Sequence, residues 1–300
     1  MFKNLIVYRI APDWTADPAQ LEAALDKMRF VPCTPTQPMS AGWVEPRGVA
    51  HAPLVEVVDG HWLLKLQVEH KAVPGAVVRR RAEEMAAQIE QQTGRKPGKK
   101  QMKELKEDAL HELLPQAFAK RASVQVWIDP TQRLLLVDSG SANRADEVVT
   151  QLVKAGDGLA LTLLQTAETP VAVMSAWLAG TEPPAAFSID RECELKSPDE
   201  MKSVVRYARH ALDIEEVREH IRGGKLPTRL ALTWQGRVSF VLSDTGQIRK
   251  IAFLDGVFEG LPKVEKDEAF EADAAIATGE LRQLIPDLVE ALGGEHALTV

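Results

Sequence analysis

Residues 77–121 read VVRRRAEEMAAQIEQQTGRKPGKKQMKELKEDALHELLPQAFAKR. Apolar residues recur here at three- and four-residue steps, which is typical of helices with one apolar face. They fall into two sets: Val78, Ala82, Met85 and Ile89, then Met102, Leu105, Ala109 and Leu113. We expect the first helix over Val77–Gln92, ended by Thr93-Gly94 because glycine adopts the left-handed conformation at little cost. A second helix before Pro115 completes a helical hairpin, which we expect to protrude.

The turn of this hairpin is strongly basic. Six basic residues and one acidic residue, Glu104, lie between Arg95 and Lys106, and Pro97-Gly98 prevents the turn from being helical throughout. Arg79-Arg80-Arg81 forms a second cluster near the base of the hairpin, and we expect it to be unneutralised. Such a run is often only a solvated charged face. Dense cations at an exposed turn also suit the backbone of a polyanion.

Composition places the chain among soluble globular proteins. Its 300 residues suggest two or three domains. No apolar run reaches the roughly 18 residues of a membrane helix, so we expect no membrane partner. The N-terminal apolar run is short and predicts a strand rather than a signal peptide. Two cysteines, Cys33 and Cys193, make neither a disulfide framework nor a metal site, which favours a reduced, cytoplasmic protein.

The net charge of −7 argues at first against a nucleic-acid partner. However, residues 255–300 hold eleven acidic and three basic residues, whereas residues 1–254 hold 33 basic and 32 acidic ones. The negative excess is therefore confined to the C-terminal end. A basic working surface can coexist with an acidic remote end, although this segregation can also be accidental.

Alternating and helical patterns predict an α+β fold with mainly antiparallel sheets and packed helices. Strands are expected at Leu5–Ile10, Val55–Val58, Trp62–Val68, Val124–Ile128, Leu134–Val137, Leu159–Leu164, Phe187–Ile189, Cys193–Leu195 and Val204–Leu212. A three-strand meander follows at Leu230–Trp234, Val238–Leu242 and Ile248–Leu254. Helices are expected at Pro18–Met28, Ala142–Lys154, Ile214–Ile221 and Thr278–Leu292.

Other segments are less regular. Val31–Pro53 is rich in proline and glycine and predicts an ordered loop around Trp43, whereas Val171–Leu178 fits either helix or strand. In Val204–Leu212, Arg206, Ala208 and His210 are expected on one face, with Tyr207 and Arg209 on the other. Gly180–Pro184 is the best linker candidate. These features divide the chain into a central α+β region (1–75 and 122–180), the basic hairpin as a tip (76–121) and a C-terminal α+β region (181–300).

Motifs for catalysis were not found. Gly94–Lys100 superficially resembles a phosphate-binding loop, but it is one residue short of the Walker spacing and lacks the Ser/Thr that would hold magnesium. His210 and His220 have no second ligand pair near them in sequence, so no metal or other cofactor is expected. Aromatic residues near cations are sparse, with Phe118 and Tyr207 the examples, which favours contact with a duplex backbone over base stacking. The residues therefore indicate a non-enzymatic protein.

Several short stretches of the sequence match a known family more specifically than a pattern of apolar and polar residues does. Through them the chain resembles the recombination-associated protein RdgC family over nearly its whole length. These stretches are 1–9 (MFKNLIVYR), 30–33 (FVPC), 42–46 (GWVEP), 94–96 (GRK), 110–118 (LHELLPQAF), 224–226 (GKL), 230–234 (LALTW), 240–244 (FVLSD) and 278–281 (TGEL). One local departure lies at Lys120-Arg121-Ala122, where other members can carry a second aromatic residue after Phe118. Its absence puts an aromatic contact at the tip-to-tip interface in doubt.

The resemblance implies a bacterial, nucleoid-associated, non-catalytic DNA-binding protein. It implies subunits that pair head-to-head and tail-to-tail into a closed homodimeric ring, with duplex DNA passing through a basic hole. Binding is expected to be independent of sequence and to limit access of the strand-exchange recombinase to DNA. Double-stranded DNA is the expected partner, and binding of single strands is left open.

Ten residues are candidate phosphate contacts, neutralising phosphate and releasing counterions without reading bases. On the hairpin they are Arg95, Lys96, Lys99, Lys100 and Lys103. On the C-terminal sheet they are Lys202, Arg206, Arg209, Lys225 and Arg229. Any one of them can equally be a plain surface cation. The rival hypothesis is a protein-interaction module whose hairpin docks on an acidic partner without DNA.

Overall fold

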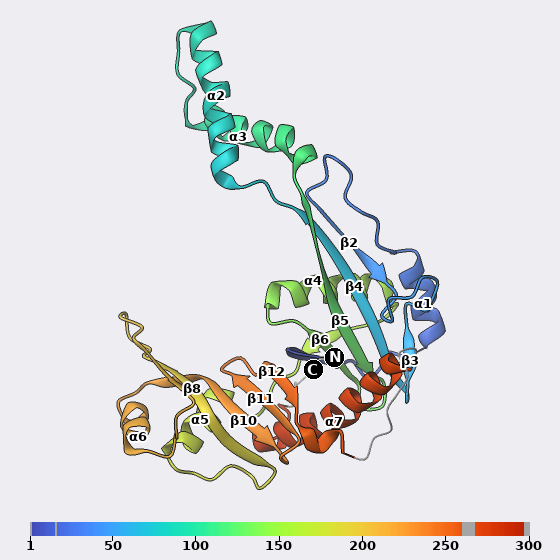
Figure 1. Ribbon diagram of the computed structural model, residues 1–300, viewed down its shortest axis with the longest axis vertical. Helices are drawn as coiled ribbons and strands as arrows, with labels where there is room; N and C mark the ends of the chain where they lie inside the picture. The colour runs from blue at the N-terminus through green and yellow to red at the C-terminus, as the bar shows by residue number, and fades with distance from the viewer. Residues whose placement is uncertain (1, 16, 260–267, 297–300) are drawn as a thin grey trace. The chain divides into compact units, whose positions relative to one another are not determined.

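The computed structural model describes residues 2–15, 17–259 and 268–296. Contacts divide the chain into two compact units, one of Met1–Glu22, Val55–Leu64 and Gln125–Val300, the other of Ala23–Leu54 and Lys65–Val124. Helix α1 (Pro18–Asp26) and strands β4 (His61–Lys71) and β5 (Ala119–Asp129) have residues in both. The predicted α+β class with antiparallel sheets is confirmed, and Figure 1 labels most of the elements. The three-region division of the chain stays a prediction.

The first unit is built on an antiparallel sheet ordered β6-β1-β12-β11-β10-β8-β9, with β7 paired to β1 and β3 paired to β4. Its strands are β1 (Leu5–Ile10), β3 (Glu56–Val58), β6 (Leu134–Asp138), β7 (Leu161–Leu163), β8 (Phe187–Lys196), β9 (Val204–Ala208), β10 (Leu226–Trp234), β11 (Val238–Ser243) and β12 (Ile248–Phe253). The predicted meander is therefore confirmed as β10-β11-β12. Leu232 lies opposite Phe240 in this register, and both side chains are buried.

Four helices belong wholly to this unit: α4 (Ala142–Ala155), α5 (Pro170–Ala179), α6 (Glu215–Arg222) and α7 (Ala269–Ala291). The core joins Leu230, Leu232 and Trp234 to apolar residues of α5, α6 and α7. Trp234 Nε1 also donates a hydrogen bond to Asp287 Oδ2 at 2.8 Å, so the buried indole keeps a polar partner. A 3₁₀ turn, Asp255–Val257, follows β12. Among the described residues, no helix has the length and apolar character needed to span a bilayer.

The structure decides one ambiguous element of this unit and corrects three predicted ones. The ambiguous segment is helix α5, whose start is capped by Thr169 Oγ1 accepting from the Ala172 N–H at 3.3 Å. The two strands expected within residues 187–195 are one strand, β8. The strand expected to reach Leu212 ends at Ala208, because Arg209 has φ +57°, so the face assigned to Arg209 and His210 was wrong. Helix α7 begins at Ala269, well before Thr278.

The second unit holds β2 (Met39–Val44), which pairs with β4, and β5 follows β4 in the strand order. The prediction of a loop over Val31–Pro53 was wrong at its centre, since Trp43 is a buried residue of β2. The strand lies so close to the preceding chain that a Cβ on Gly42 would sit 2.4 Å from Phe30 Cα. A glycine there is a requirement of packing rather than a sign of a loop.

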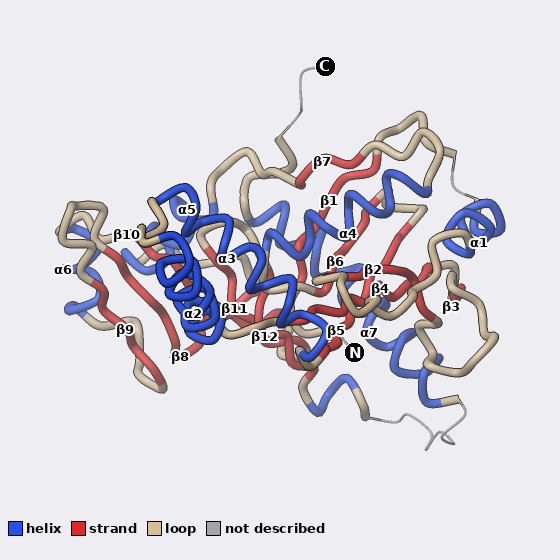
Figure 2. The backbone as a smooth tube through the Cα atoms, turned by 90° about the horizontal axis from the view of Figure 1, so that it is seen from above, coloured by secondary structure: helices blue, strands red, loops and turns tan. Residues whose placement is uncertain are grey.

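The predicted hairpin is confirmed as α2 (Gly75–Thr93) and α3 (Lys99–Leu113), followed by a 3₁₀ turn, Leu114–Gln116. The two helices lie next to each other in Figures 1 and 2. Their shared core consists of Ala82, Ala86, Leu105 and Ala109, with Val78, Met85, Ile89 and Met102 packed around it. Each helix thus buries one narrow stripe against the other, as the periodicity predicted, although Leu113 is not part of this core.

A buried polar cluster links the turn after β5 to α7 in the first unit. His61 Nδ1 lies 3.7 Å from Asp129 Oδ2, and Arg282 Nε lies 3.4 Å from the same oxygen. The other carboxylate oxygen of Asp129 accepts from the N–H groups of Thr131 and Gln132. Burial lowers the pKa of His61, with the Asp129 carboxylate opposing this shift and Arg282 adding to it. His61 is therefore neutral in the folded protein near pH 7.

Leu105→Ala is expected to destabilise the hairpin by about 2–4 kcal/mol, because the small core cannot refill the space. Amide hydrogen exchange of α2 and α3 measures this effect directly. Leu110→Ala is the matched control, since Leu110 lies on the same helix and is 37% exposed. Equal loss of protection in the two variants would contradict the packing described for this hairpin.

The unfolding free energy should fall as pH drops from 7 to about 5.5. The folded-state pKa of His61 lies below its unfolded value, so in this window the unfolded chain binds a proton that the folded chain does not. His61→Gln should flatten this part of the pH profile, measured by urea denaturation at each pH. A profile of unchanged slope in the variant would show that His61 does not carry the effect.

Candidate nucleic-acid interface

The hairpin turn presents its cations to solvent. Gly94 ends α2 with φ +70° and donates its N–H to Glu90 O at 2.8 Å, and Gly98 precedes α3 in an extended conformation. Four predicted contacts are exposed and form no ion pair within 4.0 Å in the part of the chain that the structure describes: Arg95, Lys96, Lys99 and Lys100. The fifth, Lys103, has its ammonium 3.9 Å from Glu107 Oε1.

Two of these lysines occupy an electrostatically unusual position. Lys99 and Lys100 form the first residues of α3, and the first turn of this helix contains no acidic residue. A helix N-terminus already carries partial positive charge and free N–H groups, so cations there are disfavoured unless an anion joins them. Phosphate satisfies both features at once. The local arrangement at the turn therefore suits a phosphate group.

The arginine cluster near the base of the hairpin is different, and the expectation that it is unneutralised was wrong for Arg80 and Arg81. Arg81 makes two hydrogen bonds to Glu112, at 2.8 and 3.0 Å, and another to Glu84 at 3.2 Å. Arg80 lies 3.9 Å from Glu84. Glu112 belongs to α3, so the pair ties the two helices together. Arg81 is consequently a structural residue of the hairpin.

Phe118, directly before β5, is 94% exposed. Three residues later, Arg121 Nε donates to Glu69 Oε2 at 2.6 Å, and its guanidinium lies 5.5 Å from the centre of the Phe30 ring. Glu69 also accepts from the Cys33 N–H at 2.7 Å. Arg121 and Cys33 together hold the pKa of Glu69 below its usual value. Arg121 is thus engaged inside the second unit, while Phe118 has its ring in solvent.

The sheet candidates belong to the first unit. Arg206 and Arg229 lie directly opposite Glu194 on its two neighbouring strands. Arg206 Nε donates to Glu194 Oε2 at 2.6 Å. Lys202 is an exposed turn residue with φ +47°, and Lys225, between α6 and β10, is half-buried. The structure therefore brings Arg206 and Arg229 together around one carboxylate.

Arg209 is not part of this group of Arg206, Arg229 and Glu194. It lies at the edge of a hollow of about 310 Å³. Ala231, Ser239 and Val241 line this hollow, and Arg191 and Lys250 are the other cations around it. The ammonium of Lys250 is paired with Glu192, and Thr233 Oγ1 donates to Asp190 Oδ2 at 2.8 Å. Sequence reasoning missed Arg191 and Lys250. Lys250 has φ +51°, which no strand alternation could have indicated.

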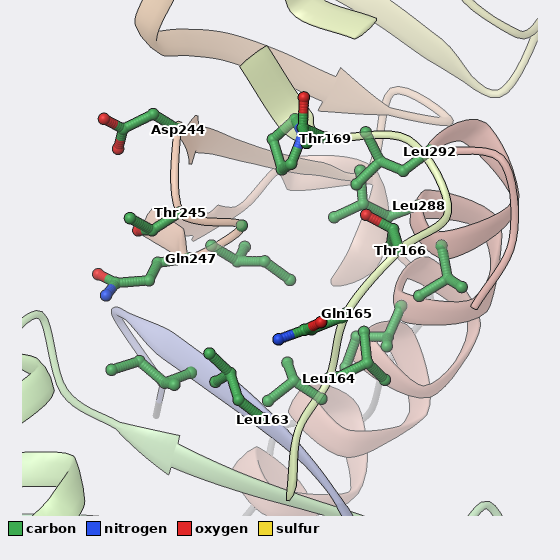
Figure 3. A pocket seen from close by; sticks show the side chains of 17 residues that line it. Leu163, Leu164, Gln165, Thr166, Thr169, Asp244, Thr245, Gln247, Leu288 and Leu292 are labelled. Atoms are coloured by element: carbon green, nitrogen blue, oxygen red, sulfur yellow. The ribbon is translucent and has the colours of Figure 1, made fainter. Parts of the chain in front are cut away.

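A separate cavity of about 370 Å³ lies in the first unit (Figure 3). Its walls are formed by apolar residues of α7, β1 and the segment after β7, with Asp244, Thr245 and Gln247 at the turn between β11 and β12. None of the ten predicted contacts lines it. Among the described residues, no group of three His, Cys, Asp or Glu side chains is arranged to hold a metal ion.

Comparison with known proteins gives a consistent result. The family model described as "Putative exonuclease, RdgC" matches residues 1–295. The chain is 45% identical over 299 residues to "Recombination-associated protein RdgC" of Dechloromonas aromatica, covering 98% of each chain. It is 46% identical over 297 residues to the protein of that name from Cupriavidus necator, covering 98% of this chain and 99% of the relative. For the Bordetella pertussis protein the identity is 41% over 296 residues, with 98% of each chain covered.

Proposed function

The chain belongs to the RdgC family of recombination-associated proteins, and we propose that it binds duplex DNA through phosphate contacts, without sequence preference and without catalysis. The observation that carries the proposal is the set of exposed, unpaired cations at the hairpin turn, two of them at the positive end of α3. Phosphates are identical along any duplex, so such contacts position the protein without reading bases. Arg95, Lys96, Lys99 and Lys100 are the principal contacts, and the remaining predicted cations are secondary.

We further propose that two copies close a ring around the duplex. Two features support pairing at two places. Phe118 is an exposed aromatic beside the hairpin, and an isolated aromatic in water is a natural contact for a second copy. Strand β9 ends the strand order; its first residue, Val204, is 45% exposed, and Met201 just before it is 86% exposed. An unprotected edge of this kind can pair with the same edge of a partner.

A ring on DNA would be associated with the nucleoid and would occupy duplex that the strand-exchange recombinase also requires. The recombination role of the family fits this competition, which needs no chemistry on DNA. The family description also names an exonuclease, and that alternative is directly testable. With magnesium or manganese present, end-labelled duplex should remain full-length during prolonged incubation with purified protein. Progressive shortening of the label would establish the exonuclease instead.

The log of the affinity for duplex DNA should fall linearly with the log of the salt concentration, with a slope of about 0.9 per phosphate neutralised. Lys96→Ala, Lys99→Ala and Lys100→Ala combined should reduce the slope by about one for each phosphate that is no longer neutralised, equally for unrelated sequences. The unfolding free energy should change by no more than about 0.5 kcal/mol per site, because these side chains are exposed. Fluorescence anisotropy over a salt series measures the affinity and its slope, and urea denaturation measures the stability.

The matched control for this triple variant combines Lys3→Ala, Lys27→Ala and Lys154→Ala. These lysines are exposed and lie outside the hairpin, and the change in net charge is the same. An equal effect in control and test variants would mean that only overall charge matters. A preference of more than about tenfold for one DNA sequence would contradict backbone binding.

Light scattering should report a dimer at micromolar concentration. A closed ring should also remain on a circular plasmid through a high-salt wash and leave once the plasmid is cut. Phe118→Asp should weaken this retention by opening one contact, whereas Val153→Asp, another exposed apolar position, should not. A monomer in solution, or equal loss from circular and linear DNA, would exclude the ring and leave a basic patch.

A further inference from the structure

Three charged residues form a row across neighbouring strands of the first unit. Arg229 on β10 lies opposite Glu194 on β8, and Glu194 lies opposite Arg206 on β9. Directly opposed residues of antiparallel strands point to the same face, with Cβ atoms roughly 5 Å apart. Both arginines are exposed. One carboxylate is therefore inserted between two residues that the sequence predicts as phosphate contacts.

The carboxylate is firmly held in this place. Arg206 Nε donates to Oε2 at 2.6 Å, and Thr228 Oγ1 donates to Oε1 at 2.7 Å. The Glu194 side chain is only 14% exposed, whereas that of Arg206 is 72% exposed. The carboxylate is thus largely shielded from solvent, whereas most of the Arg206 side chain is in contact with solvent. The hydrogen bond from Thr228, then that from Arg206 and the charge of Arg229, lower the pKa of Glu194, so it is ionised at neutral pH.

The ionised carboxylate of Glu194 lowers the net positive charge that this row presents to an anion. Two arginines alone would present two positive charges, but with Glu194 the row carries only one. A phosphate that approaches Arg206 must share the guanidinium with a carboxylate already bound to its Nε. Electrostatic repulsion between that carboxylate and the phosphate opposes binding, and partial burial limits its screening by salt.

We propose that Glu194 is an affinity-determining residue, an internal competitor that weakens the contact of Arg206 and Arg229 with the DNA backbone. The inference rests on the proposed DNA-binding function. A weakened sheet contact leaves the hairpin turn as the stronger anchor. It would also let the protein release and shift along a duplex without first breaking every contact.

Glu194→Gln tests this role. Glutamine keeps the shape, can accept from Arg206 Nε and can donate to Thr228 Oγ1, so mainly the charge is removed. The salt dependence of duplex binding should steepen by about 0.9, and affinity near physiological salt should rise roughly threefold or more. Glu219→Gln is the matched control, because Glu219 is an exposed residue of α6 and the change in net charge is identical. Unchanged or weaker binding by Glu194→Gln would overturn the proposal.

A second variant tests specifically whether Glu194 competes with phosphate for Arg206. Glu194→Gln combined with Arg206→Gln restores the wild-type net charge and leaves no unpaired buried carboxylate. If Glu194 cancels Arg206, this double variant should bind DNA within about twofold of the wild type, whereas Arg206→Gln alone should bind more weakly. Binding by the double variant as weak as that of Arg206→Gln would contradict competition.

The outcome also distinguishes this inference from the proposed function. Wild-type protein that binds DNA in a hairpin-dependent way, with no gain in Glu194→Gln, would reject the competitor and keep the function. Wild-type protein that does not bind duplex DNA at any salt concentration would reject both. Circular dichroism and thermal melting of each variant establish that it is folded before binding is compared.

Discussion

The contact between α2 and α3 depends on a small buried core, around which larger apolar side chains pack. Ala82, Ala86 and Ala109 bring the helices together with Leu105, and the Arg81–Glu112 pair fastens the same two helices at their rim. Most long polar side chains of the hairpin are therefore exposed, whereas that of Arg81 is half-buried. The exposure of the turn lysines is a consequence of this packing.

The features that the sequence predicted well are those decided by neighbours along the chain. Helical periodicity between Val78 and Leu113 found the hairpin, and alternation around Leu232 found the meander. Gly94 was recognised as a helix end because its conformation depends only on local backbone geometry. The absence of ion pairs at Arg95 and Lys96 could also be predicted from the sequence, since few acidic residues lie near them.

The features that the sequence could not give depend on residues far apart. Gly42 belongs to a strand because Phe30 presses against it, yet its proline-rich surroundings resemble a loop. Arg81 pairs with Glu112, thirty-one positions later, because the two helices pack against each other. Tertiary contact overrides local preference in each case. The candidate interface was predicted less accurately than the fold, because the net charge of a site depends on partners that are distant in the sequence.

This dependence resolves the apparent conflict between a net charge of −7 and a polyanion partner. On β8, Asp190, Glu192 and Glu194 each have a hydrogen-bond partner on another strand, so two cations of this face, Lys250 and Arg206, are already paired with carboxylates. The hairpin turn has cations without acids. A count of charges along the chain does not distinguish the two regions. A phosphate would encounter cations already paired with carboxylates on the sheet and unpaired cations at the turn. Pairing therefore decides which parts of a chain of negative net charge still present free cations to a phosphate, and the hairpin turn is one such part.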